Sequence, residues 1–199
     1  IWKNWRMLGE GQLYDIEKDR MQENDVAAEY PEVVQHMEKA FQAYHARGKE
    51  LVQKPVRFVL GGVGSPAIEI TGQDMYWTPE SKGGQPFGQS APRDLMQAHG
   101  PYKVRIARDG KYKFTLSRYP LYTNISMSIG GRKFKKDHII RKVRISIAGK
   151  TREKVVMPED TRATFLMNLK VGDADLDTAL LGDGKDGIAY FVTAEYLGK

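Results

Sequence analysis

The feature that most constrains the fold is an alternating pattern that begins after Pro55. From there to the C-terminus, short segments rich in Val, Ile, Tyr and Phe are separated by turns rich in Gly and Asp. Asp109-Gly110 is a strong signal for a two-residue hairpin turn, and Gly130-Gly131 and Gly149-Lys150 are further turn signals. About ten short strands of this kind predict an antiparallel β-sandwich or jelly roll, a mainly β fold. The expected strands are residues 56–60, 67–71, 102–107, 111–117, 125–129, 139–148, 154–157, 163–169, 176–181 and 188–196.

The first 47 residues have a different pattern. Residues 3–8 and 12–16 are expected to form two short strands joined by Gly9-Glu10-Gly11, which suits a tight turn. Pro31 is well placed to begin a helix, because the first helical turn does not use the N–H that proline lacks. We expect this helix to end near residue 46. Its apolar residues recur at helical spacing and form a stripe that must pack on another surface: Val33, Val34, Met37, Ala40, Phe41 and Tyr44.

These two patterns divide the chain. We predict a segment of residues 1–47, formed by a short β-hairpin and one α-helix, and an antiparallel β-sandwich domain of residues 55–199. The charged residues between them contain no strong pattern. A chain of 199 residues is long enough for a small segment and one domain with a real core.

Composition excludes several classes of protein. No run approaches the ~18 apolar residues of a membrane span. No cysteine is present, which removes disulfides and cysteine-based metal or catalytic sites. The net charge is +6, and the densest basic run is 132–136. Such a run usually forms a solvated surface. Its functional interpretation is attraction to a polyanion, where we favour a sulfated polysaccharide and expect no nucleic-acid partner.

Two regions resemble parts of sulfatases. Leu13-Tyr14-Asp15, Asn24-Asp25-Val26-Ala27 and Tyr30-Pro31-Glu32-Val33-Val34 follow the order in which the catalytic domain of an arylsulfatase-type sulfatase ends. One departure is Asp19-Arg20, where that family usually has Asp-Pro. Residues 100–120 are similar to a pattern in accessory domains that follow some bacterial sulfatases, with Tyr119-Pro120 in place of Trp-Pro.

The resemblance implies that the chain is the C-terminal part of a sulfuric ester hydrolase. The catalytic formylglycine and a Ca²⁺ or Mg²⁺ would belong to an upstream catalytic domain, which would be the partner of these residues. The C/S-x-P-x-R motif that carries formylglycine is absent here, so no catalytic residue, metal ligand or cofactor is assigned. The resemblance further implies that the chain is inactive alone, that its sandwich supports the catalytic domain, and that the protein is periplasmic or secreted.

Loop 72–95, rich in Gly, Pro and Gln, is the best candidate for ligand contact. Loops this long are usually functional or disordered. In a sulfatase it would shape access of the substrate, because aromatic faces stack on sugar rings while Lys82 and Arg93 suit a sulfate group. The plainer interpretation is that the loop packs on the upstream domain. The substrate-contact candidates are Asp74, Tyr76, Trp77, Glu80, Lys82 and Arg93.

Two other functions stay open. A freestanding carbohydrate-binding β-sandwich would need exposed aromatic side chains, although the alternating spacing of the available ones suits the core. These are Tyr102, Tyr112, Phe114 and Tyr119. A purely structural or oligomerising domain is the other alternative.

Three aspartates near the C-terminus offer a weak metal signal. Asp173, Asp175 and Asp177 begin like an EF-hand loop, but Thr178 and Gly184 stand where that loop needs Gly and Glu. One interpretation is a Ca²⁺ that stabilises a loop of the sandwich, and the other is ordinary aspartates in a turn.

Overall fold

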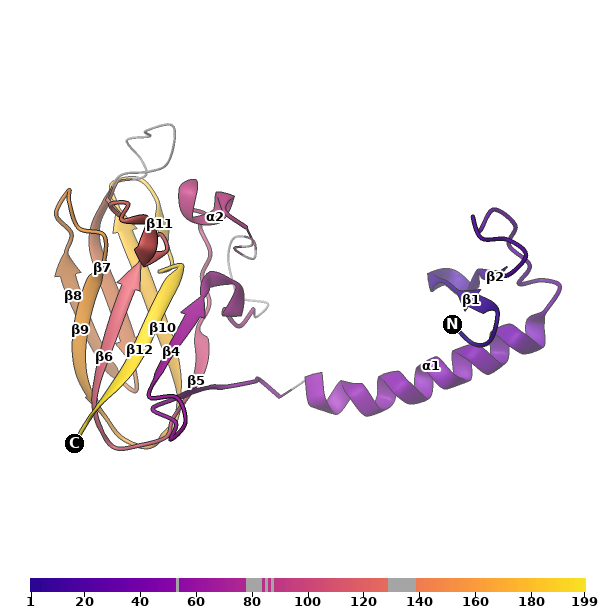
Figure 1. Cartoon of the computed structure of the whole chain (residues 1–199), viewed down its shortest axis with the longest axis horizontal. Helices are drawn as coiled ribbons and strands as arrows, with labels where there is room; N and C mark the ends of the chain where they lie inside the picture. Colours follow the sequence, from indigo (N-terminus) through magenta and orange to yellow (C-terminus); the bar gives the residue numbers. More distant parts are fainter. Residues whose placement is uncertain (53, 78–83, 85, 87, 129–138) are drawn as a thin grey trace. The chain divides into compact units, whose positions relative to one another are not determined.

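The computed structural model describes residues 1–52, 54–77, 84, 86, 88–128 and 139–199 (Figure 1). The chain falls into two compact units, Ile1–Pro55 and Val56–Lys199. Strands dominate and there is one long helix, so the expected mainly β fold class is confirmed. The basic run 132–136 and the Gly130-Gly131 turn signal lie outside the described residues.

The first unit is a β-hairpin packed on a helix. Strand β1 (Trp5–Met7) pairs antiparallel with β2 (Leu13–Asp15), and the short helix η1 (Gly9–Gly11) joins them. Helix α1 (Pro31–Val52) begins at the expected proline but continues past Gly48. A glycine inside a helix costs only about 1 kcal/mol relative to alanine, so it does not by itself end one.

The hairpin covers only the first part of the apolar stripe on α1. Leu13 packs with Val33 and Met37, and all three are buried. Further along the helix, Phe41 is 54% exposed and Tyr44 is 70% exposed. The stripe expected from the helical spacing therefore exists, and its later part faces solvent.

The second unit is a sandwich of two sheets (Figure 1). The first sheet has the order β3 (Phe58–Leu60), β5 (Tyr102–Ile106), β10 (Gly172–Gly182), β7 (Ile140–Ile147) and β8 (Lys150–Val155), and β11 (Asp186–Gly187) pairs with β10. The second sheet has the order β4 (Ala67–Thr71), β12 (Phe191–Gly198), β6 (Gly110–Ser117) and β9 (Ala163–Leu169). Neighbouring strands are antiparallel except β3 and β5, which are parallel.

The core lies between the two sheets and follows from the alternation within the strands. Successive strand residues point to opposite faces, so every second side chain enters the core. In β6 these are Tyr112, Phe114 and Leu116, all fully buried. Tyr102 is also fully buried, and Tyr119 is 8% exposed. Three of the four aromatic residues that the sequence offered for a binding face therefore fill the core, and Tyr119 lies outside this core cluster.

The hairpin predicted at Asp109-Gly110 is wrong. Strands β5 and β6 on either side of it lie in different sheets, so the chain crosses between sheets here. The Arg108 side chain holds this crossing by donating to the carbonyls of Gly61 and Gly62 at 2.6 and 2.9 Å. Gly110 has φ +149°, and an added Cβ would collide with the Gly198 carbonyl. Local sequence does not distinguish this crossing from a hairpin.

Three expected strands differ most from the structure, and one of them, β10, begins at Gly172 rather than at residue 176. Residues 125–128 are irregular rather than a strand, and residue 129 lies outside the described part of the chain. Strand β8 begins at Lys150 rather than at residue 154. Ala148 and Gly149 both have positive φ, 49° and 73°, which is the backbone of a two-residue turn that suits antiparallel strands. Pairing therefore resumes at once, with Lys150 opposite Ile147.

Candidate functional site

The predicted contact residues Asp74 and Tyr76 have structural partners. Asp74 ends the short helix η2 (Gly72–Asp74), and its Oδ2 accepts from the backbone N and the Oγ1 of Thr71 at 2.7 and 2.9 Å. The backbone N of Tyr76 donates to the Pro101 carbonyl at 2.8 Å. The Nζ of Lys103 lies 5.2 Å from the centre of the Tyr76 ring. Both residues therefore anchor the beginning of the long loop.

The other predicted contact residues do not gather at one place. Trp77 is 39% exposed. Arg93, in the short helix α2 (Ser90–Arg93), forms a two-bond ion pair with the neighbouring Asp94 at 3.1 and 2.8 Å. Glu80 and Lys82 lie outside the described residues. None of the four described candidates lines either of the two hollows described below.

The first hollow, which we call the aromatic groove, has a volume of about 520 Å³. It lies where β4 ends, β12 begins and the chain leaves β6, because Phe191 pairs with both Thr71 and Ser117. Its lining combines aromatic, proline, hydroxyl and amide side chains. The lining residues are Thr71, Gly72, Gln73, Pro86, Gly88, Gln89, Pro92, Tyr119, Pro120, Tyr122, Thr123, Tyr190 and Phe191.

Tyr122 is the most exposed aromatic residue of this groove, with 90% of its surface accessible. It sits in the short helix η3 (Leu121–Thr123), where Thr123 Oγ1 donates to the Pro120 carbonyl at 2.7 Å. Asn124 ends η3 in the left-handed conformation with φ 51°, which asparagine tolerates well. Local turn chemistry thus holds an exposed tyrosine over the groove.

Two glutamine side chains provide polar groups at the same groove. Gln73 and Gln89 are both exposed, and neither side-chain amide bonds to another described residue. Each amide offers two N–H donors and a carbonyl acceptor. The amides are therefore free to bond a ligand.

The floor of the groove is closely packed. An added Cβ on Gly72 would lie 3.2 Å from Pro86 Cγ and 3.3 Å from Tyr190 Cδ1, closer than most real contacts. The Gly72 N donates to the Tyr190 carbonyl at 2.8 Å, and the Tyr190 hydroxyl donates to the Met96 carbonyl at 2.7 Å. Burial raises the pKa of Tyr190, so its phenol stays neutral.

A buried arginine ties the surrounding segments together. Arg118 is fully buried, and its guanidinium donates to the carbonyls of Pro92 at 2.7 Å, Arg93 at 3.1 Å and Met127 at 3.4 Å. These bonds connect α2 with the segment that follows η3. Burial lowers the pKa of Arg118. Sequence reasoning missed this residue, because an arginine at the end of a strand is normally exposed.

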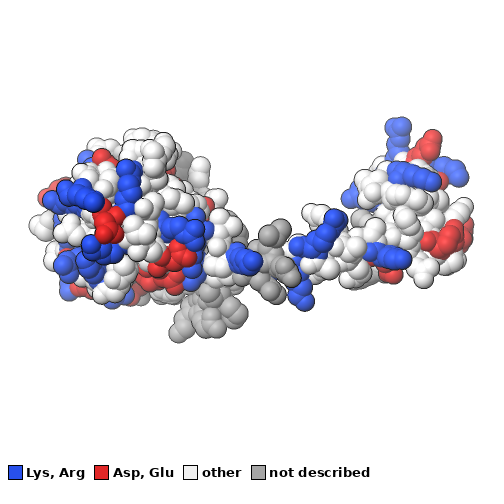
Figure 2. Space-filling model, turned by 90° about the horizontal axis from the view of Figure 1, so that it is seen from below, with Lys and Arg blue, Asp and Glu red and all other residues white. Residues whose placement is uncertain are grey.

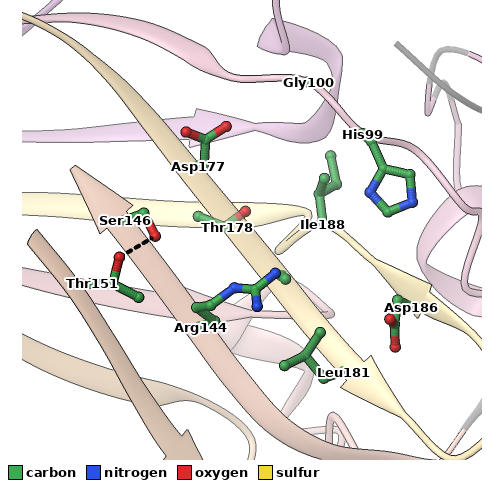
Figure 3. A pocket seen from close by; sticks show the side chains of 11 residues that line it. His99, Gly100, Arg144, Ser146, Thr151, Asp177, Thr178, Leu181, Asp186 and Ile188 are labelled. Carbon is green, nitrogen blue, oxygen red and sulfur yellow. Dashed lines mark hydrogen bonds between the residues drawn. The ribbon is translucent and has the colours of Figure 1, made fainter. Parts of the chain in front are cut away.

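The second hollow, which we call the polar hollow, lies over the outer face of the first sheet and has a volume of about 450 Å³ (Figure 3). Within it, Ser146 Oγ and Thr151 Oγ1 are hydrogen-bonded at 2.9 Å. Arg144, Asp177 and Asp186 add charged groups to the wall, and Leu181 and Ile188 add apolar ones. The lining residues are His99, Gly100, Arg144, Ser146, Thr151, Asp177, Thr178, Ala179, Leu181, Asp186 and Ile188.

The three aspartates of the EF-hand-like motif lie on strand β10, so neither a metal-binding loop nor a turn is present there. Asp173 forms an ion pair with Arg105 at 2.7 Å, and Asp175 forms one with Lys103 at 2.8 Å. Asp177 makes no hydrogen bond or ion pair with any described residue. No group of three metal-binding side chains occurs among residues that the structure describes.

Charge is mixed on one face of the sandwich. Lys and Arg side chains are interspersed with Asp and Glu on the face of the sandwich seen in Figure 2. No helix in the described part of the chain is long and apolar enough to cross a membrane.

No family model matches the chain, and no curated protein matches it. Among solved structures, it is similar to a GH26-CBM35 β-(1,4)-mannanase of Podospora anserina, at 9% identity and a TM-score of 0.39 over 67% of this chain and 28% of that chain. It is also similar to a ruminal GH26 endo-β-1,4-mannanase, at 18% identity and a TM-score of 0.35 over 66% of this chain and 26% of that one. A third likeness is to the C-terminal CBM6 of LamC, a marine laminarinase from Zobellia galactanivorans. There the identity is 11% and the TM-score 0.34, over 65% of this chain and 98% of that one.

The prediction of a sulfatase fragment is wrong. None of the solved structures named above is a sulfatase, and no family or curated match supports one. The residues that suggested it have local explanations, since Leu13-Tyr14-Asp15 is a buried strand of the hairpin and Pro31 begins a helix. Without a sulfatase catalytic domain, the expected role of loop 72–95 in shaping a sulfatase cleft has no basis. Because TM-scores this low assign no function, the function has to rest on the side chains themselves.

Proposed function

We propose that the sandwich is a carbohydrate-binding module that holds a glycan in the aromatic groove. The observation that carries this proposal is the Tyr122 ring, 90% exposed beside unbonded glutamine amides. A sugar ring has an apolar face of C–H groups and an edge of hydroxyls. An exposed tyrosine offers a matching flat apolar surface, and the amides of Gln73 and Gln89 can donate to and accept from hydroxyls.

The size of the groove supports a small part of a glycan chain as the ligand. Ligand sites usually have volumes of about 300–1,000 Å³, mostly apolar walls and a few convergent polar groups. The groove, at about 520 Å³, has this composition. Its closely packed floor at Gly72 and the Arg118 bonds to both neighbouring segments keep the shape in place without a ligand.

The groove suits a neutral glycan. The described residues that line it include no Asp, Glu, Lys, Arg or His. A sulfated or uronic sugar would therefore leave its charge without a partner there. Hydrolysis of a glycosidic bond usually needs two carboxyl groups. Binding without cleavage is thus the activity that this lining supports.

Affinity electrophoresis of the intact chain tests the proposal. The gels would contain konjac glucomannan, laminarin, xylan or chondroitin sulfate. We expect at least one neutral polysaccharide to retard the wild-type chain, and Tyr122→Ala to bind roughly tenfold more weakly because the stacking surface is lost. Tyr44→Ala is the matched control, since it removes another exposed tyrosine from the first unit. Equal retardation of wild type and Tyr122→Ala, or no retardation by any neutral polysaccharide, would contradict the proposal.

A further inference from the structure

We propose that the polar hollow is a second sugar-binding site, in which Asp177 and Arg144 bind hydroxyls of a neutral glycan. This inference rests on the proposed function, because it takes the ligand class from there. It concerns a different surface, the outer face of the first sheet, and different side chains.

The pairing of the strands explains why Asp177 has no partner. Asp173 lies opposite Arg105 and Asp175 lies opposite Lys103, and both pairs form ion pairs. Strand β5 begins at Tyr102, opposite Leu176, so it has no residue to offer Asp177. On its other side Asp177 lies opposite Ser146, a small neutral residue. A carboxylate is thus left open toward the hollow.

The hydrogen-bond donors of Arg144 are also only partly occupied. It lies opposite Ala179, whose small side chain leaves room above the sheet. Its ion pair with Glu153 is long, at 3.8 Å between Nη1 and Oε1. Figure 3 shows the Arg144 and Asp177 side chains on one open surface, with the Ser146–Thr151 hydroxyl pair to one side and His99 and Asp186 to the other. Donors of the guanidinium therefore remain available to a ligand.

Sugar hydroxyls match both groups. One hydroxyl can donate to the Asp177 carboxylate while another accepts from the Arg144 guanidinium, and hydrogen bonds to ionised groups are stronger than those between neutral groups. A metal cation would leave the Arg144 guanidinium without an acceptor. A phosphate or sulfate group would be repelled by the Asp177 carboxylate. A neutral polyol satisfies both charges at once. The hydroxyls of Ser146 and Thr151 extend the polar surface along the same face.

The open carboxylate has a cost that paired aspartates do not have. Partial desolvation of its carboxylate, together with the charge of Asp175, raises the pKa of Asp177. The pKa of Asp173 is instead lowered by its bond to Arg105. Carboxyl groups whose ionised form is destabilised by the surroundings are more common at functional sites than elsewhere. Two sugar sites on one sandwich would also let a long polysaccharide bind more strongly than a short oligosaccharide.

Chemical-shift titration of the isotopically labelled intact chain tests this inference. Mannohexaose, cellohexaose and laminarihexaose are the probes. The backbone amides of Ser146 and Thr178 report on the polar hollow, and the side-chain amides of Gln73 and Gln89 report on the aromatic groove. We expect the hollow reporters to shift with at least one hexaose in wild type and in Tyr122→Ala. Asp177→Ala should weaken that response at least about tenfold.

The matched control is Asp173→Ala, which removes a carboxylate from the same face of β10 and should leave the response unchanged, because Asp173 pairs with Arg105 and Arg57 away from the hollow. Silent hollow reporters beside responding groove reporters would overturn this inference and leave the proposed function standing. The opposite pattern would overturn the proposed function and keep this site. An undiminished hollow response in Asp177→Ala would also overturn the inference, and silence at both sites would overturn both.

Discussion

At the scale of single residues, two charged side chains of the sandwich have opposite surroundings. Arg118 is fully buried, and its guanidinium donates to the backbone carbonyls of three separate residues. Asp177 is exposed and bonds to no described residue. The first arrangement stabilises the folded chain and the second weakens it, so substitutions at the two positions should have opposite effects.

Replacing Arg118 with methionine should be strongly destabilising. Methionine fills much of the space but removes the guanidinium donors from the carbonyls of Pro92, Arg93 and Met127. Among described residues only Pro92 keeps a backbone donor, Leu95 N at 3.4 Å. The expected loss in free energy of unfolding is about 3 kcal/mol, measured by urea denaturation. Arg105→Met, which removes an exposed ion pair, should cost less than about 1 kcal/mol. Equal losses in the two variants would show that the Arg118 bonds contribute little.

Replacing Asp177 with asparagine should raise stability at neutral pH. Its pKa is raised in the folded chain, so the folded state binds the proton more tightly than the unfolded state and wild type loses stability as pH rises above 3.8. The gain of the variant should be below about 1 kcal/mol, because water screens the exposed group. Urea denaturation at acidic and neutral pH measures it. The difference should be present at neutral pH and vanish below the unfolded pKa.

Asp173→Asn is the counterpart for this comparison. Its bond to Arg105 lowers the pKa of Asp173, so the wild-type carboxylate adds stability above its unfolded pKa and this variant should lose stability at neutral pH. If both asparagine variants changed stability in the same direction, the contrast between paired and unpaired aspartates on β10 would be wrong.

At the scale of elements, η2 connects strand β4 to the long loop and presents Gln73 to the groove. Sequence analysis placed Asp74 among the ligand contacts, whereas the structure gives it the Thr71 backbone and hydroxyl as partners. Its carboxylate satisfies a backbone N–H that the short helix leaves unpaired, which is a common role for aspartate at helix ends.

Asp74→Ala should therefore reduce stability by about 1 kcal/mol, as does removal of a helix cap. Gln73→Ala, one residue earlier, should leave stability nearly unchanged and should weaken glycan binding. Thermal or urea denaturation together with a binding assay separates the two effects. A normal stability of Asp74→Ala with lost binding would restore Asp74 as a ligand contact.

The strands were predictable from the sequence because alternation with a period of two is a local property. The pairing partners of the strands were not predictable. Asp109-Gly110 illustrates this, because the same dipeptide can form a hairpin turn or a crossing between sheets. Sequence analysis missed the groove and Tyr122, although the position of Tyr122 between the turn-favouring Pro120 and Asn124 is a local signal for an exposed side chain. The roles of Arg118 and Asp177 could not be predicted from the sequence. They depend on Met127, Lys103 and other residues that are distant in sequence and come close only in the folded chain.

At the scale of the whole molecule, the chain carries a net charge of +6 while the described lining of the aromatic groove is uncharged. General attraction of a basic protein to polyanions weakens steeply with salt. Stacking and amide contacts to a neutral sugar do not depend on charge in this way. Salt dependence therefore separates binding in the groove from unspecific adhesion.

The most direct test of the glycan-binding claim is calorimetric titration of the intact chain with each of the neutral polysaccharides konjac glucomannan, laminarin and xylan, at low salt and at about 0.5 M salt, where exposed charges are largely screened. The account predicts binding that changes little with salt, weakens roughly tenfold in Tyr122→Ala and is unchanged in Tyr44→Ala. Absence of binding, binding that disappears at high salt, or equal affinity of Tyr122→Ala and wild type would contradict it.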